Sequence, residues 1–145
     1  MAEIFPNEGL NLIMPNAGFT SGGTTPTNMW LALFTTYTAS TVGDSASVRA
    51  SYGEPTGGAY ARQTIAAASW GALANSGTYG RISTCAQISF TQATGSYSAA
   101  VNGFFVANSL TVGTAYFAAN FDDTTAVTIN TNDQIKVTPS VIFGG

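Results

Sequence analysis

The segment EPTGGAYARQTI at residues 54–65 holds an acid and a base whose types and spacing could do chemistry. Glu54 and Arg62 stand on either side of the turn-forming pair Gly57-Gly58. A carboxylate beside a guanidinium can form a bidentate ion pair, bind a ligand or take part in acid–base catalysis. The residues after the glycines alternate like a strand, which places Arg62 on the same face as Tyr60. The segment is therefore either a site or the entry of a strand that carries an anchoring charge.

The side chains that most often carry catalysis are missing or isolated. The chain has no His, which excludes Ser–His–Asp catalysis and imidazole metal sites. Cys85 is the only Cys, so it allows no internal disulfide, and we interpret it as an inert small residue. Asp122-Asp123 follow a strand and could offer oxygen ligands to Ca²⁺, but neighbouring strand residues point to opposite faces, so we favour a solvated turn. These observations predict no enzyme, no metal and no cofactor.

Charged residues are unusually scarce. They make up 8% of the 145 residues, against about 25% in a typical soluble domain, and the net charge is −3. The basic residues do not cluster, which argues against nucleic acid or membrane as a partner; they are Arg49, Arg62, Arg81 and Lys136. No apolar run approaches the roughly 20 residues that span a bilayer, and the acidic N-terminus is not typical of a secretory signal. A surface with so little charge is weakly protected against association, so we expect a protein that packs against neighbours.

Patterns with a period of two residues dominate the chain after its first part. Alternating or apolar runs predict strands at residues 30–37, 59–65, 82–90, 99–107, 114–121, 127–129, 134–138 and 141–143, with a further one near Trp70. In the run 82–90, Ile82, Ile88 and Phe90 share the apolar face, and Cys85 lies on the polar face. Residues 38–58 read as a long irregular loop, of a length that is more often functional than idle.

About eight short strands with Gly and Asn between them predict an all-β fold. We expect an antiparallel β-sandwich or jelly-roll-like single domain over residues 29–145. Residues 1–28 are predicted to form an arm and loop, with a short helix near Leu10–Met14 that must pack on something to be stable. The sequence shows no linker that would divide the sandwich and no fixed-period repeat.

Four stretches together resemble a family of small structural proteins of tailed bacteriophages, of the tail-fibre or head-decoration type. They are WLALFT at 30–35, similar to LYVGLFT; EPTGGAYARQ at 54–63, similar to E-V-x-G-G-G-Y-A-R-Q; ISFTQATGSY at 88–97, similar to I-x-F-x-x-A-T-G-x-W; and VTINTNDQI at 127–135, similar to V-x-x-G-D-T-V. The resemblance covers roughly residues 7–143. The chain departs from the pattern at Asn132, where the family usually has Gly, at Ser98–Ala100, and in an apparent insertion at 38–53.

The resemblance implies a non-enzymatic protein of the virion, made in the cytoplasm of the host bacterium. We favour a capsid decoration or cement protein that binds the shell of the major capsid protein, because the sequence lacks the repetitive shaft of a fibre. The alternative is a tail-fibre or baseplate protein, with carbohydrate or host-receptor binding as a further role. The expected partners are other virion proteins and further copies of the chain, as a trimer or dimer.

The charged and aromatic residues then become candidates for anchors and interfaces. The candidate structural or intersubunit anchors are Glu54, Arg62, Tyr60 and Arg49, and the candidate interface aromatics are Trp70, Tyr79 and Tyr97. We predict that Gly57 or Gly58 takes a positive φ. Arg62 is then expected to make a bidentate or stacked contact, within its own chain in preference to a neighbouring subunit. An exposed pair with Glu54 would contribute only about 0–1 kcal/mol.

Overall fold

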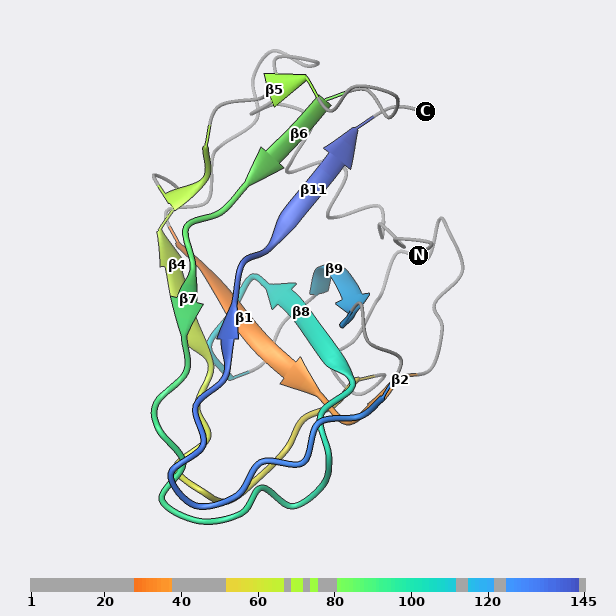
Figure 1. Ribbon diagram of the computed structural model, residues 1–145. Helices are drawn as coiled ribbons and strands as arrows, with labels where there is room; N and C mark the ends of the chain where they lie inside the picture. The colour runs from red at the N-terminus through yellow and green to blue at the C-terminus, as the bar shows by residue number, and fades with distance from the viewer. Residues whose placement is uncertain are drawn as a thin grey trace.

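The unbroken apolar run GFFVA at residues 103–107 forms one of the two inner strands of the main sheet. The structure is a computed structural model that describes residues 28–37, 52–66, 69–71, 74–75, 81–111, 115–121 and 125–143. Its strands are β1 (Asn28–Phe34), β2 (Thr36–Tyr37), β3 (Tyr52–Gly53), β4 (Gln63–Ala66), β5 (Ala74–Asn75), β6 (Arg81–Thr84), β7 (Ile88–Ser89), β8 (Gly103–Ala107), β9 (Ala115–Asn120), β10 (Lys136–Val137) and β11 (Ser140–Phe143) (Figure 1). Every residue of β8 is buried. A strand that is buried on both faces has no polar position, which explains the run GFFVA.

The main sheet has the strand order β4-β1-β8-β9, and each neighbouring pair is antiparallel. The register pairs Ala32 with Phe105 and Leu33 with Phe104. Because successive side chains alternate, these pairs point to opposite faces of the sheet. The remaining described strands form the sheets β11-β6-β5, β10-β7 and β2-β3. The expected all-β, antiparallel fold is confirmed, and the described residues contain no α-helix.

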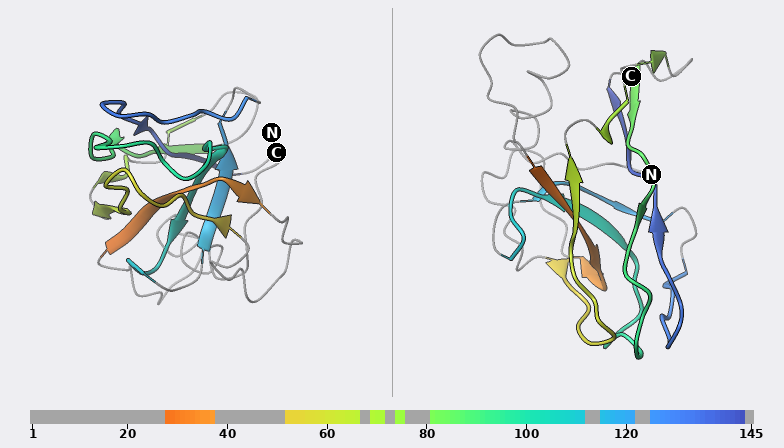
Figure 2. Two further views of the ribbon diagram at one scale, coloured as in Figure 1. Left: turned by 90° about the horizontal axis from the view of Figure 1, so that it is seen from below. Right: turned by 90° about the vertical axis from the view of Figure 1, so that its left-hand side faces the viewer.

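The two faces of the main sheet carry two separate cores. The larger core lies between the main sheet and the segments around β6, β7, β10 and β11, which form a second layer in the left view of Figure 2. It joins Leu31 and Val106 of the main sheet to Phe90 and Val137 of the second layer. The smaller core, on the opposite face of the sheet, includes Phe34, Tyr52 and Phe105. The larger core, packed between the main sheet and this second layer, gives the arrangement of a β-sandwich.

The strand predicted at residues 82–90 differs from the structure. The run 82–90 is divided into β6 and β7, and Cys85 between them is 2% exposed, on the buried face and not on the polar face that we expected. The pairs Lys136↔Ser89 and Ser140↔Thr84 differ in register by one residue. A one-residue irregularity of this kind exchanges the inward and outward positions of a strand, which places the Cys85 side chain in the core.

The other differences lie at strand ends. The strand predicted at 59–65 begins only at Gln63, because Ala59 has a φ of 63° and the chain is still turning at that point. Residues 127–129 form no regular strand, although Val127 makes an isolated bridge with Val101. The N-terminal arm with its predicted helix and most of the 38–58 loop, residues 38–51, lie outside the described residues.

Candidate functional site: the Glu54–Tyr60–Arg62 cluster

A left-handed turn brings the polar residues of the segment 54–62 together. Gly57 and Gly58 have φ values of 80° and 57°, which confirms the predicted positive φ at this pair, and Ala59 follows with 63°. The N–H of Tyr60 donates to Gly57 O at 2.9 Å and closes the turn. A side chain on Gly58 would collide with the main chain of Gly95, so this position requires glycine for space as well as for φ. The tight turn folds Arg62 back over Glu54.

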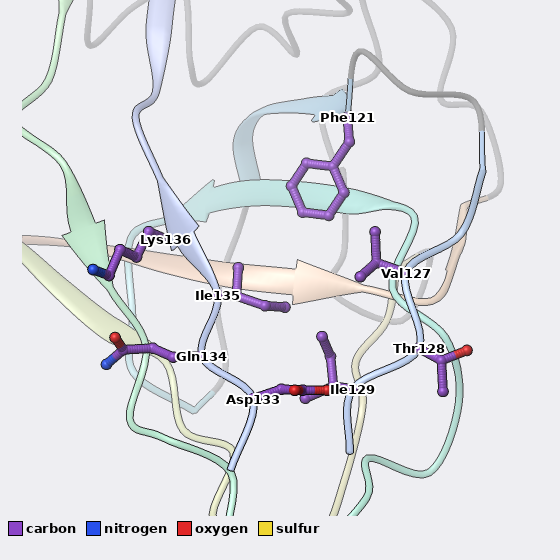
Figure 3. Close-up of a pocket in the computed structure, with 8 residues that line it drawn as sticks. All are labelled: Phe121, Val127, Thr128, Ile129, Asp133, Gln134, Ile135 and Lys136. Atoms are coloured by element: carbon purple, nitrogen blue, oxygen red, sulfur yellow. The ribbon is translucent and has the colours of Figure 1, made fainter. Parts of the chain in front are cut away.

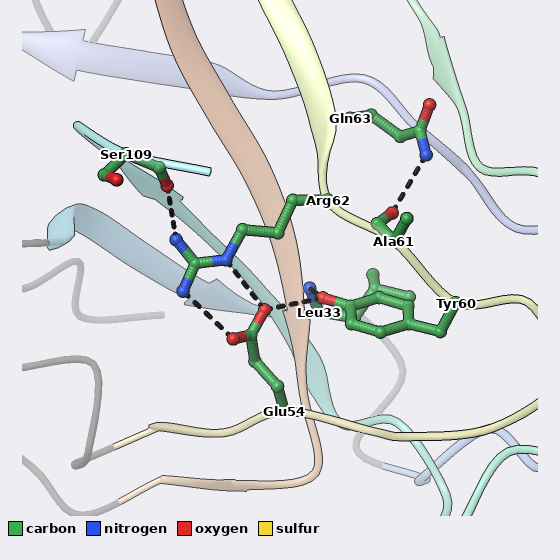
Figure 4. Close-up of polar contacts among 7 residues, drawn as sticks. All are labelled: Leu33, Glu54, Tyr60, Ala61, Arg62, Gln63 and Ser109. Atoms are coloured by element: carbon green, nitrogen blue, oxygen red, sulfur yellow. Dashed lines mark hydrogen bonds and ion pairs between the residues drawn. The ribbon is translucent and has the colours of Figure 1, made fainter. Parts of the chain in front are cut away.

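Glu54 and Arg62 form a bidentate ion pair that is almost fully buried (Figure 4). The Nε and Nη2 groups of Arg62 donate to the two carboxylate oxygens of Glu54, each at 2.9 Å. The two side chains are 3% and 9% exposed. The pair expected from the sequence therefore exists, but the estimate for an exposed pair does not apply, because removing one partner would leave the other charged in a buried place.

Arg62 also contacts the main sheet beyond its pair with Glu54. Its guanidinium carbon lies 5.2 Å from the centroid of the Phe105 ring, so the cation faces the smaller core. Its Nη1 group donates to Ser109 O in the loop after β8 (Figure 4). The fork of one guanidinium thus joins Glu54, the inner strand β8 and the loop that follows it.

The hydroxyl of Tyr60 completes the cluster as both donor and acceptor. Its O–H donates to Glu54 Oε1 at 2.9 Å, and the Tyr60 hydroxyl oxygen accepts a hydrogen bond from the N–H of Leu33 at 3.0 Å. The last residue pair between β1 and β4 is Leu31↔Gln63, so β4 offers no partner to Leu33. The phenol therefore replaces a missing ladder partner. Burial, together with the negative charge of Glu54, raises the pKa of Tyr60, so the hydroxyl keeps its proton.

Hydrogen bonds between main chains hold three chain segments together beside this cluster. Segment 54–62 bonds to segment 88–101 through Thr94 N to Gly58 O and Ser98 N to Thr56 O. Segment 88–101 bonds in turn to segment 127–137, for example through Tyr97 N to Ile129 O. The Tyr60 ring lies between the rings of Phe90 and Tyr97, with centroid distances of 6.0 and 5.6 Å. The cluster therefore lies where the stacked segments meet the main sheet.

Asn132 explains one departure of the chain from the family pattern. It has a φ of 73°, a conformation that glycine adopts freely and that Asn tolerates better than most residues. The Asp133 carboxylate accepts the N–H of Asn130 at 2.8 Å and stabilises the same turn. Asn in place of the usual Gly is thus compatible with the backbone at this position.

The remaining expected site residues do not join the cluster. Arg49, Tyr79 and Asp122-Asp123 lie outside the described residues. Trp70 is half-buried, packs edge-on against Phe117, and its buried Nε1 finds no hydrogen-bond partner in the part of the chain that the structure describes. Tyr97 is only 8% exposed and belongs to the larger core, so it lacks the exposed ring that an interface aromatic needs. The local sequence ATGSYS at residues 93–98 gives no sign that this turn folds inward.

The sequence does not indicate which residues the cluster contacts, namely Leu33 and Phe105 of the main sheet and Ser109 of the loop after β8. Leu33 and Phe105 lie in runs that predict strands, but no local pattern shows which residue of one strand meets the loop of another. Ser109 contributes only its carbonyl oxygen, which every residue has.

The geometry of the cluster suits joining segments better than presenting a reactive group. Both oxygens of Glu54 accept hydrogen bonds, and Arg62 is buried, so neither is offered to solvent as a base or a ligand group. The described residues contain no group of three or more His, Cys, Asp or Glu that could hold a metal ion. No described helix is long and apolar enough to cross a membrane. These features define an all-β domain whose polar cluster joins its loops.

A comparison with known protein families agrees with this class and narrows it. The family described as podophage GP4 fiber I protein gp80 matches residues 2–142. Because the match covers nearly the whole chain, the chain belongs to this family. No curated protein and no solved structure matches the chain.

The family membership decides several expectations from the sequence. The chain belongs to a phage structural family of the tail-fibre type, and the expected location in the virion is confirmed. The family is one of fibre proteins, which favours the tail-fibre alternative over the capsid decoration role that we expected first.

Proposed function

We propose that this protein is a non-enzymatic structural subunit of a bacteriophage tail fibre and acts through contacts with other virion proteins. The observation that carries the proposal is the family match over residues 2–142. The composition supports it, because a chain with 8% charged residues and a net charge of −3 has little electrostatic protection against packing.

Within this function, the Glu54–Tyr60–Arg62 cluster is a structural anchor. Its contacts join the segment 54–62 to β1 through Leu33, to β8 through Phe105 and to the following loop through Ser109. A buried, fully paired polar cluster fixes the relative positions of the segments that carry it. Loops held in fixed positions present the same surface to neighbouring virion proteins in every copy of the subunit.

The location in the particle is tested by labelling intact virions with antibodies against the chain, followed by electron microscopy. We expect label at the tail, and we expect the protein to copurify with tails that have been detached from heads. Label distributed over the faces of the head, or binding to expanded empty heads with increased resistance to heat, would overturn the fibre proposal in favour of decoration. Virions that lack the protein serve as the control for antibody specificity.

A further inference from the structure

A hollow of about 400 Å³ opens on the side of the sandwich formed by segment 127–137 (Figure 3). Four apolar residues line it, Phe121, Val127, Ile129 and Ile135, together with four polar ones, Thr128, Asp133, Gln134 and Lys136. In Figure 3 the four apolar side chains point toward a common space, whereas Lys136 and Gln134 point away from it. Val127 is 42% exposed, so the hollow is open to a partner.

The hollow lies at an end of the stack of three segments. Val127 N and O both bond to Val101, and Phe90 N donates to Ile135 O, so segment 127–137 pairs with segment 88–101 on one side. On its other side, the main chains of Thr128 and Gln134 make no hydrogen bonds within the described residues. Among the described residues the stack therefore ends here, with apolar side chains next to main-chain groups that no described segment pairs.

Leu110 is the other large apolar side chain that is exposed among the described residues, at 52%. It lies in the loop that follows β8, next to Ser109, whose carbonyl oxygen is held by Arg62 Nη1. The hydrogen bond from the buried Arg62 side chain therefore holds the loop that carries Leu110 in place. A projecting side chain on a fixed loop loses little conformational freedom when it is bound, which favours its use as an anchor.

The projecting leucine and the hollow lie on opposite sides of the molecule. In the right view of Figure 2 the loop after β8 and segment 125–137 occupy opposite edges, and the left view separates them in the same way. Complementary features on different faces of one molecule cannot meet within a single chain. They can meet between copies through a heterologous contact, in which the face of one copy that carries Leu110 contacts the face of the next copy that carries the hollow.

We propose that Leu110 of one copy inserts into the hollow at Val127 of a second copy. A leucine side chain is small enough for a hollow of about 400 Å³, and the side chains of Phe121, Val127, Ile129 and Ile135 offer it apolar contacts there. Charge is compatible with the contact, because the hollow is flanked by one carboxylate, Asp133, and one ammonium, Lys136, while the segment 108–111 is uncharged. The low net charge of −3 adds little repulsion between copies.

This contact goes beyond the proposed function, since it can form or fail whichever virion protein the chain binds. Its heterologous geometry produces either a closed ring or an open row of copies, according to the rotation between neighbours. A trimer, which we expected from the sequence, is one such ring. A dimer with two-fold symmetry is not produced by this contact.

Association is tested by sedimentation velocity over a series of protein concentrations. We expect the wild-type chain to associate, and we expect Leu110→Ser to weaken association about tenfold or more while thermal unfolding stays unchanged. Val127→Gln, on the rim of the hollow, should have the same effect. Thr94→Gln, at an exposed position of the 93–98 turn, is the matched control and should associate like the wild type.

The direction of the contact is tested with cysteines. A mixture of Leu110→Cys and Val127→Cys chains should form a disulfide-linked dimer on oxidation, whereas either variant alone should not, and Cys85 is buried in both. A mixture of Leu110→Cys with Thr94→Cys is the control. The proposal is overturned if the wild type stays monomeric at its highest soluble concentration, if Leu110→Ser associates normally, or if Leu110→Cys alone crosslinks efficiently. These outcomes leave the tail location to be decided by labelling.

Discussion

The centre of the main sheet and the Glu54–Tyr60–Arg62 cluster at its β4 side are stabilised in opposite ways. Around β8, neighbouring strands bury only apolar side chains, such as Leu31, Val106 and Phe105. In the cluster, three polar side chains are buried as a set, and each depends on the others for its hydrogen bonds. Loss of an apolar side chain around β8 removes only the contacts and volume of that side chain, whereas loss of one member of the cluster also leaves its partners buried without their hydrogen bonds.

The largest effect is expected when the charge of Arg62 is removed from the cluster. Arg62→Ala leaves Glu54 buried without its counterion, and we expect a loss of about 3–5 kcal/mol in the free energy of unfolding. Urea unfolding monitored by circular dichroism measures it. Lys136→Ala, which removes an exposed cation, should stay within about 0.5 kcal/mol of the wild type. An Arg62→Ala protein as stable as this control would contradict the structural account of the cluster.

The second change tests the apolar centre. Leu31 is fully buried in β1, and Leu31→Ala should lower the free energy of unfolding by about 2–5 kcal/mol through lost apolar contact and a residual cavity. The loss should be partly recovered in Leu31→Val, which leaves a smaller cavity. The same urea experiment applies. If Leu31→Val were as damaging as Leu31→Ala, the volume of the buried side chain would not be the cause.

A third and smaller effect is expected at Tyr60. Tyr60→Phe keeps the ring between Phe90 and Tyr97 but removes the acceptor of Leu33 N–H and one donor to Glu54. We expect a loss of about 1–3 kcal/mol. Tyr97→Phe is the matched control, since no hydrogen bond of the Tyr97 hydroxyl is found among the described residues, and it should cost less. Equal losses in the two variants would show that the Tyr60 hydroxyl bonds have no net effect.

The same hydroxyl predicts a dependence of stability on alkaline pH. Burial and the charge of Glu54 raise the pKa of Tyr60 above its ordinary value of 10.0. Above about pH 10 the unfolded chain releases this proton while the folded chain keeps it, so stability is lost as pH rises, by at most about 1.4 kcal/mol per pH unit for one group. Urea unfolding from about pH 9 to about pH 11 measures the slope. Tyr60→Phe should make the slope shallower, and an unchanged slope would exclude Tyr60 as its source.

The sequence could predict the apolar part of the fold better than the polar part. The run around Phe104, Phe105 and Val106 indicates a buried strand by itself, because no polar residue interrupts it. The division of the run 82–90 could not be predicted, since it depends on a one-residue change in register between β6–β11 and β7–β10. Register between distant strands is set by tertiary packing, and no pattern within one strand records it.

The site could be predicted in part. The positive φ at Gly57-Gly58 and the contact of Arg62 with Glu54 follow from a turn with an acid and a base on either side. The burial of this pair does not follow, because it depends on Phe105 and the loop at Ser109, which lie far along the chain. The fibre assignment came from the whole chain, and no single motif distinguishes tail from capsid.

The central claim is that Glu54 and Arg62 act together as a structural anchor, and a double-mutant cycle tests it most directly. The free energy of unfolding is measured for the wild type, Glu54→Ala, Arg62→Ala and the double variant. We predict that the double variant is more stable than the sum of the two single losses implies, by about 1–3 kcal/mol. Losses that add within about 0.5 kcal/mol would contradict the claim, because independent side chains do not form one anchor.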